Sequence, residues 1–150
     1  MEIAARRART ATLALLMISW GCGEGLTGPP ETARWDVDAF VDQLRALGVD
    51  VEQSGPINQP FFPASGVRLL VNGHQVSAYA FSTSEIAAAA AGGVSADGST
   101  IVGDGVAYNV LWVGPPHFFL RERVIVLYVG DDGEILELLE GVLGPQFAGR

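Results

Sequence analysis

The chain has 150 residues, a hydrophobic share of 49% and a formal net charge of −8 at pH 7. This length suffices for one domain with its own hydrophobic core. Nine basic residues, all arginine, face seventeen acidic ones. That balance argues against nucleic acid as a partner and against electrostatic attachment to anionic lipids, because both need a basic patch.

Residues 1–21 have the composition of a secretory signal. Arg6, Arg7 and Arg9 precede an apolar run over residues 11–20. The run is too short to span ~30 Å of hydrocarbon as a helix, which needs about 20 residues, but it fits the apolar region of a signal peptide.

Gly21 and Cys22 follow this run, and Cys22 is the only cysteine. A small residue before a lone cysteine at this point resembles a bacterial lipoprotein signal. The resemblance implies cleavage before Cys22, which would then carry the lipid, palmitate included. Ser19 and Trp20 depart from the usual aliphatic and small residues, so a plain secretory peptide with an incidental cysteine remains the alternative.

Cleavage there would remove three arginines and one acid, leaving six arginines against sixteen acids. Residues 22–34 are rich in Gly, Pro and polar side chains and predict a flexible tether. We therefore expect a signal peptide over 1–21, a tether over 22–34 and one domain over 35–150. The location implied is the extracytoplasmic side of a membrane, the outer membrane if the host has one, because Gly23 is not the acid that retains lipoproteins at the inner one.

The domain begins with an amphipathic helix over 37–47, with Asp36 as N-cap, Trp35 packing on Phe40, and Gly48 at the stop. A short strand over 49–52 follows. Residues 54–66 contain three prolines and two glycines and predict an irregular loop. Its two adjacent aromatic residues, Phe61 and Phe62, are either packed down or partly exposed as a contact surface.

Residues 67–81 predict a β-hairpin, because Asn72-Gly73 is a two-residue turn between β-rich runs. This register pairs Val71 with His74 and Leu69 with Val76, so one apolar face of the hairpin meets the helices. A capping box over 82–85 predicts a helix over 83–91, and residues 95–106 predict a turn-rich connection.

Residues 107–130 predict two further strands, with apolar runs over 110–113 and 124–129 and a reversal at 121–123. The second run is apolar on both faces and suits an inner strand. Pro115 and Pro116 must end or bulge the first strand. A final helix capped by Asp131 has an inner stripe of Ile135, Leu138, Leu139 and Val142. The order of elements predicts an α+β fold, a mostly antiparallel sheet of about five strands with about three helices.

Few residues could carry chemistry. Two histidines, His74 and His117, without a free cysteine make a metal site improbable, and no motif for a cofactor is present. Helix capping accounts for the acids of 131–134. His117 precedes Phe118 and Phe119, and since neighbours on a strand point to opposite faces, we expect one ring in the core and the other facing outward as a contact anchor.

The C-terminal block is similar to an uncharacterised family of small bacterial lipoproteins. The likeness lies in Trp112-Val113, Pro116-His117-Phe118, 126–131 and 143–149, together with the Asn72-Gly73 hairpin. It covers about residues 38–150 and is strongest over the last 40. The resemblance implies export and lipidation and implies no activity.

The sequence does not define a molecular function and leaves two hypotheses open. The first is a lipid-anchored, non-catalytic module that binds a protein or small-molecule partner, with His117, Phe118, Phe119, Phe61 and Phe62 as a possible contact surface. The alternative is a small extracytoplasmic hydrolase that uses His117 with an acid brought near by the fold. The geometry around His117 discriminates between them.

Overall fold

The computed structural model describes residues 35–149, which all belong to one compact unit. The predicted α+β class is confirmed: three helices accompany a six-stranded antiparallel sheet and a separate two-stranded one. The proposed signal, Cys22 and the tether lie outside the described residues.

The elements in chain order are α1 (Val37–Ala46), β1 (Val51–Gln59), β2 (Phe62–Val71), β3 (His74–Ala80), α2 (Ser84–Gly92), β4 (Thr100–Gly103), β5 (Val106–Asn109), β6 (Pro116–Arg121), β7 (Val124–Val129), α3 (Gly133–Leu143) and β8 (Ala148–Gly149).

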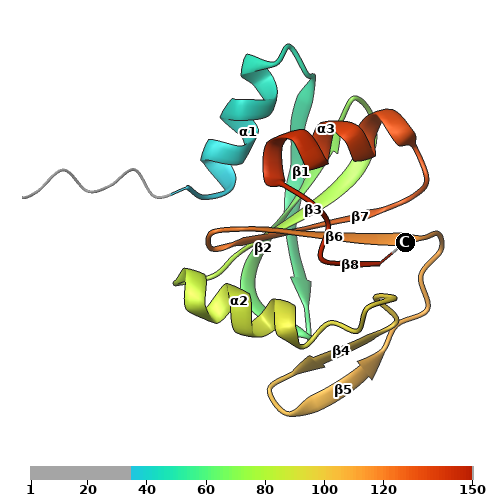
Figure 1. Cartoon of the computed structure of the whole chain (residues 1–150). Coiled ribbons are helices and arrows are strands. Elements are labelled where there is room, and N and C mark those ends of the chain that lie inside the picture. The colour runs from blue at the N-terminus through green and yellow to red at the C-terminus, as the bar shows by residue number, and fades with distance from the viewer. Residues whose placement is uncertain (1–34, 150) are drawn as a thin grey trace, which may run out of the picture. The chain divides into compact units, whose positions relative to one another are not determined.

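The main sheet has the strand order β1-β2-β3-β7-β6-β8. Helices α1 and α3 lie over one face, called here the α1/α3 face (Figure 1). Helix α2 and the β4–β5 hairpin lie toward the other, called the α2 face. The sheet is therefore the middle layer of three.

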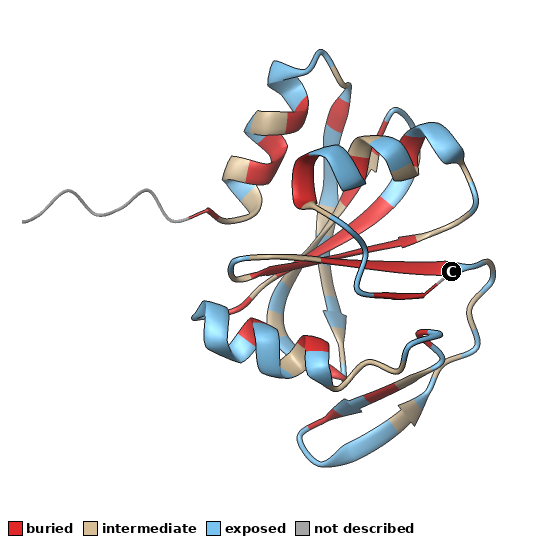
Figure 2. Cartoon of the chain, viewed as in Figure 1, coloured by how far each residue is buried: buried red, intermediate tan, exposed pale blue. Residues whose placement is uncertain are grey.

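Each face has its own hydrophobic core, and strands β6 and β7 are buried along most of their length (Figure 2). The core of the α1/α3 face includes Phe40, Leu44, Leu69, Val76, Phe119, Val126, Tyr128, Ile135 and Leu139. The core of the α2 face includes Phe61, Phe62, Tyr79, Phe81, Ala87, Ile101, Phe118, Ile125 and Leu127. An inner β7, apolar on both faces, was predicted and is confirmed.

The start of α1 follows the sequence prediction. The Asp36 carboxylate accepts a hydrogen bond from the Ala39 N–H at 3.2 Å. Trp35 packs on Phe40, with ring centroids 6.0 Å apart. Asp36 also pairs with Arg123, from the turn between β6 and β7, at 3.2 Å. One residue thus caps the helix and ties it to the sheet.

The β2–β3 hairpin has the predicted turn and register. Asn72 and Gly73 both have positive φ, 47° and 82°, as a two-residue turn of this type requires. Val71 pairs with His74, and Leu69 pairs with Val76. The apolar face of the hairpin meets α1 and α3, as expected, whereas α2 lies on the opposite side.

The prediction of an irregular loop over 54–66 was wrong, because these residues form most of β1 and the first half of β2. Strand β1 lies at the edge of the sheet and pairs with a neighbour on one side only. Pro56 is tolerated there because an edge strand does not need a backbone donor at every residue. Register shifts between Gln53 and Gly55 and between Ile57 and Gln59 absorb the remaining irregularity.

Two predictions between 95 and 113 were also wrong. The expected connection over 95–106 contains β4 and the start of β5, which turn at Asp104-Gly105 with φ of 50° and 76°. The expected strand over 110–113 is absent from the described fold, and Leu111 and Val113 are fully exposed there. The first strand of the C-terminal hairpin instead begins at Pro116, since a proline is tolerated at the first residue of a strand.

Two helix caps lie one residue later than predicted. Thr83, rather than Ser82, accepts the hydrogen bond from the Ile86 N–H and starts α2. Asp132, rather than Asp131, caps α3 by accepting from two backbone N–H groups. The inner stripe of α3 ends on Leu143, whereas Leu138 is only half-buried.

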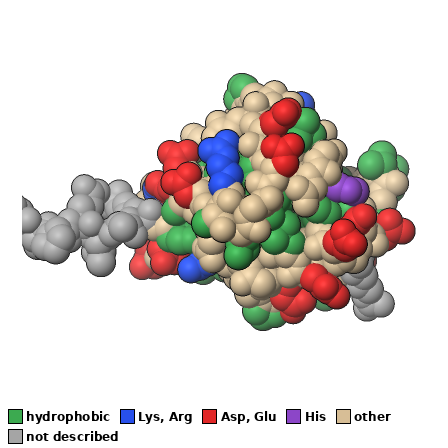
Figure 3. Space-filling model, turned by 90° about the horizontal axis from the view of Figure 1, so that it is seen from above, with side chains coloured by type: hydrophobic (Ala, Val, Ile, Leu, Met, Phe, Trp, Pro, Cys, Tyr) green, Lys and Arg blue, Asp and Glu red, His purple; other side chains and the backbone are tan. Residues whose placement is uncertain are grey.

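Acidic side chains predominate over basic ones on the face shown in Figure 3, in keeping with the net charge of −8. The acidic side chains form separate groups, with apolar areas between them. This charge distribution offers no basic surface to a polyanion on that face.

Candidate functional site

The predicted contrast between Phe118 and Phe119 was half right. The two rings point to opposite faces of β6, Phe118 into the core of the α2 face and Phe119 into that of the α1/α3 face. Their exposed fractions are 0% and 2%. Because both faces of the sheet are covered at β6, neither ring is available as a contact anchor.

Phe61 and Phe62 are also core residues, with exposed fractions of 4% and 2%. Their rings meet edge to face at 5.0 Å, and Phe62 packs on Tyr79 in the same manner at 5.1 Å. The two phenylalanines are packed down at the β1–β2 turn, so the interpretation as a contact surface was wrong.

His117 has a structural environment. Its ring is 5% exposed and stacks on Tyr128, with centroids 6.1 Å apart. Its Nδ1 lies 2.7 Å from the Oε1 of Gln146, and its buried Nε2 has no partner in the protein. Neither ring nitrogen bonds a carboxylate or a hydroxyl, so this geometry gives the hydrolase alternative no acid to work with.

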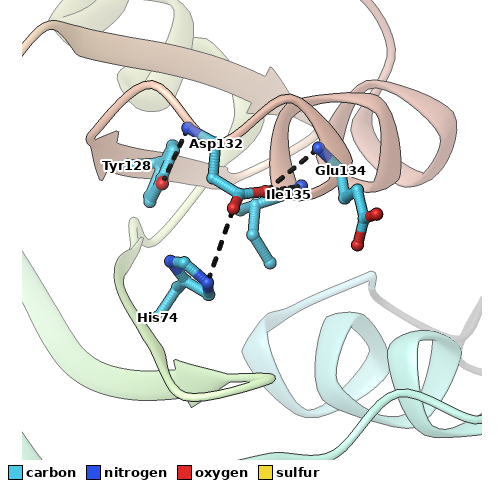
Figure 4. Close-up of polar contacts among 5 residues, drawn as sticks. All are labelled: His74, Tyr128, Asp132, Glu134 and Ile135. Carbon is cyan, nitrogen blue, oxygen red and sulfur yellow. Dashed lines mark hydrogen bonds and ion pairs between the residues drawn. The ribbon is translucent and has the colours of Figure 1, made fainter.

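His74 lies on the other side of Tyr128, at the N-terminal end of α3 (Figure 4). Its Nε2 is 3.8 Å from a carboxylate oxygen of Asp132, and both side chains are about two-fifths exposed. The other oxygen of Asp132 caps α3. An exposed pair of this kind stabilises little, and the capping role already explains the acid.

Among residues 35–149, no group of three or more His, Cys, Asp or Glu side chains is placed to hold a metal ion. Within the same range, no helix combines the length and the apolar character that crossing a bilayer requires.

The best candidate site is a groove on the α2 face, beyond the area that α2 covers. We call it the β3 groove. Its volume is about 290 Å³, close to the lower end of the ~300–1,000 Å³ typical of small-molecule sites. It is lined by Ile57, Gln59, Gln75, Ser77, Tyr79, Trp112, Val113, Leu127 and Val129.

The lining divides into an apolar and a polar side. The apolar side comes from strands β1 and β7 and from the segment between β5 and β6, through Ile57, Leu127, Val129, Trp112 and Val113. The polar side is mostly one strand, since alternate residues of β3 carry an amide, a hydroxyl and a phenol. No carboxylate is among the lining side chains.

Tyr79 is the unusual member of the polar side. It is fully buried, and its hydroxyl has no hydrogen-bond partner in the protein. Burial raises the pKa of this phenol, and the neighbouring Ser77, Gln59 and Arg68 lower it by smaller amounts without completing a hydrogen bond. An unpaired buried hydroxyl costs roughly 1–3 kcal/mol, which a structural tyrosine would be expected to avoid.

The ring of Tyr79 reaches this position across Gly66 of β2. The two residues are paired, and a Cβ on Gly66 would approach the ring to 2.9 Å and the Ile57 carbonyl oxygen to 2.4 Å. Glycine is therefore required at position 66 by close packing.

Trp112 is held over the groove by the loop at 95–99. Its Nε1 donates to the Gly98 carbonyl at 2.8 Å, and its ring packs on Phe118 at 5.9 Å. Asp97 orders this loop by accepting from the Ser95 and Ser99 side chains and the Ser99 backbone. These bonds, that from the Ser95 hydroxyl foremost, lower the pKa of Asp97 to about 2.

The groove was not predicted from the sequence. The one available signal was the alternation on 75–79, which places Gln75, Ser77 and Tyr79 on the face opposite the apolar one. What was missing was the knowledge that the 110–113 segment leaves the sheet and arches over that face.

Comparison of the chain with protein-family models, with curated proteins and with solved structures found no match in any of the three.

Proposed function

We propose that this protein is a lipid-anchored, non-catalytic binding protein of the bacterial cell envelope, and that it binds a small amphipathic molecule in the β3 groove. The observation that carries the binding role is the unpaired Tyr79 hydroxyl beneath a groove with one polar and one apolar side. Ligand sites are typically largely apolar with a few convergent polar groups.

The anchoring part rests on the N-terminal sequence. Arginines, a short apolar run and Gly21-Cys22 occur in the order of a lipoprotein signal. Both hydrophobic cores consist of residues 35–148. Cleavage before Cys22 would leave all of these core residues on the tethered domain.

Binding is tested by the emission of Trp112. The chain from residue 23 onward, carrying Trp35→Phe, has this tryptophan as its sole reporter. Titration with an amphipathic probe, octanamide, should change the emission in a saturable manner. Ser77→Leu fills the groove and should abolish the change, whereas Ser65→Leu, on another strand position away from the groove, should not. An unsaturable or absent response in the parent protein would contradict the binding role.

Anchoring is tested in the host. The full-length chain should incorporate labelled palmitate and partition into the detergent phase, and Cys22→Ser should abolish both. In a host with two membranes, fractionation should find the protein in the outer one. A cleaved product without lipid would show that the signal is a plain secretory one.

A further inference from the structure

The arginines of the described chain differ in what they bind. Arg45 donates to the Val51 carbonyl. Arg121 donates to Gln43 and to a backbone carbonyl, and lies over the Trp35 ring. Arg123 donates to the Phe81 carbonyl and to Asp36. Among residues 35–149, Arg68 is the arginine without a hydrogen bond or ion pair to another residue of that range.

Arg68 lies beside the polar side of the β3 groove. It is the cross-strand partner of Ser77, and directly paired residues of an antiparallel sheet share a face. Its charge is close enough to act on the Tyr79 hydroxyl. The Nε is buried without a partner, while the residue as a whole is only half-buried.

The acids around Arg68 do not neutralise it. Glu52, on β1 opposite Leu70, is on the same face of the sheet but does not come within 4.0 Å of the guanidinium. The cross-strand partner of Arg68 on β1 is Gly55, which has no side chain. The protein has a net charge of −8, yet this half-buried guanidinium has no carboxylate partner among the described residues. Its positive charge and its hydrogen-bond donors can therefore bind an anion.

The chemistry of the site favours a carboxylate. A guanidinium pairs with a carboxylate through two parallel hydrogen bonds. A phosphate would be expected to need several cations or a set of backbone N–H groups, and the groove is lined by no further cation. The apolar side then suits a short hydrocarbon chain, and about 290 Å³ limits the ligand to a small molecule.

We propose that the ligand of the β3 groove is a small carboxylate with a short apolar chain, whose anionic group pairs with Arg68 and accepts from the Ser77 or Tyr79 hydroxyl. This inference rests on the proposed binding function. It assigns Arg68 as the residue that selects the anion and assigns Trp112, Leu127 and Val129 to the chain.

The test compares octanoate with octanamide, which have the same number of heavy atoms and differ in charge. Trp112 emission of the Trp35→Phe chain reports both. Octanoate should bind at least about tenfold more tightly, a difference of ~1.4 kcal/mol. Arg68→Gln should abolish this preference, and Arg68→Lys should retain part of it, because a lysine keeps the charge and loses the fork.

Arg45→Gln is the matched control, since it removes the same charge from α1. It should leave the preference for octanoate unchanged. Equal affinities of the parent for the two probes, or a preference that survives Arg68→Gln in a variant with a native circular dichroism spectrum, would overturn the carboxylate proposal while leaving the groove a binding site. No Trp112 response to either probe would overturn the proposed function as well.

Discussion

Two halves of the same sheet face have opposite chemistry. Where β6 and β7 pass under α2, the α2 face consists of buried apolar side chains such as Phe118 and Ile125. Where β2 and β3 continue beyond the helix, the same face presents Arg68, Ser77 and Gln75. The two halves share a backbone ladder through the β3–β7 pairing.

The fold does not require polar side chains in the polar half. On the opposite face, toward α1 and α3, strands β3 and β7 carry apolar residues. Both strands can therefore bury apolar side chains. A polar residue beside a core is retained at a cost unless it is paired. The unpaired Tyr79 hydroxyl and Arg68 Nε therefore distinguish the polar half from a merely solvated strand surface.

The largest effect is expected in the apolar half. Truncation of either Phe118 or Phe119 to Ala should lower the free energy of unfolding by about 3–5 kcal/mol, because each ring is fully enclosed in one of the two cores. Urea denaturation measures both. Phe147→Ala is the control, since that ring is 36% exposed and its loss should cost clearly less. A loss of less than about 1 kcal/mol in the free energy of unfolding of Phe118→Ala would mean that α2 does not cover the apolar half.

A change at the hairpin turn tests how the polar half is aligned. Gly73 has a φ of 82°, and Gly73→Val should cost about 1–3 kcal/mol because a β-branched residue is strained there. Gly73→Asn tolerates this φ and is the matched control. Thermal unfolding measures both. Identical melting of the parent and Gly73→Val would mean that another feature sets the pairing of Arg68 with Ser77.

The α1/α3 face offers an independent reference, because Asp36 lies away from both halves. Asp36→Ala should cost about 1 kcal/mol through the lost N-cap. Asp36→Asn keeps the cap and loses only the ion pair between residue 36 and Arg123. Neither variant should alter octanamide binding. A binding defect in Asp36→Asn with native stability would mean that the groove depends on α1.

The same residue predicts a pH dependence. The hydrogen bond from the Ala39 N–H, and then the Arg123 guanidinium, lower the pKa of Asp36 from its ordinary value of 3.8. A carboxyl whose folded pKa is depressed stabilises the fold above its unfolded pKa, and this contribution is lost as the pH falls through the folded value. The stability difference between the parent and Asp36→Asn should therefore be constant near neutral pH and shrink below about pH 4.

The smallest effect on stability is expected in the polar half. Ser77→Val should change the free energy of unfolding by less than about 1 kcal/mol, because the groove leaves space for the added methyl groups and valine favours a strand. It should nevertheless weaken octanoate binding in the Trp112 assay. A loss of stability as large as that of Phe118→Ala would place Ser77 in the core and remove the contrast between the halves.

The sequence predicted those features that depend on neighbours in the chain. The Asn72-Gly73 turn, the cap at Asp36 and the alternation of Phe118 and Phe119 are local and were correct. Strand β1 was missed because it contains Gly55 and Pro56, which are typical of loops. The hairpin of β4 and β5 was missed because its strands are short and lie among glycine and polar residues.

What lies over each face could not be read from the chain. Nothing in the spacing of Phe118 shows that α2 crosses to the side opposite α1 and α3, and so the ring expected outside is inside. The groove likewise depends on segment 110–113 leaving the sheet, although its apolar residues predict a strand.

Binding in the β3 groove is tested most directly by an amide chemical-shift map of the ¹⁵N-labelled chain from residue 23 onward, titrated with octanoate. We expect saturable shifts confined to segments 57–59, 75–79, 112–113 and 127–129, which contain the residues that line the β3 groove. A second cavity of about 220 Å³ on the α1/α3 face, lined by Val37, Asp38, Gln53, 65–67 and Ala80, provides the internal comparison. Shifts clustered there, or scattered over the surface without saturation, would contradict the assignment of the groove as the binding site.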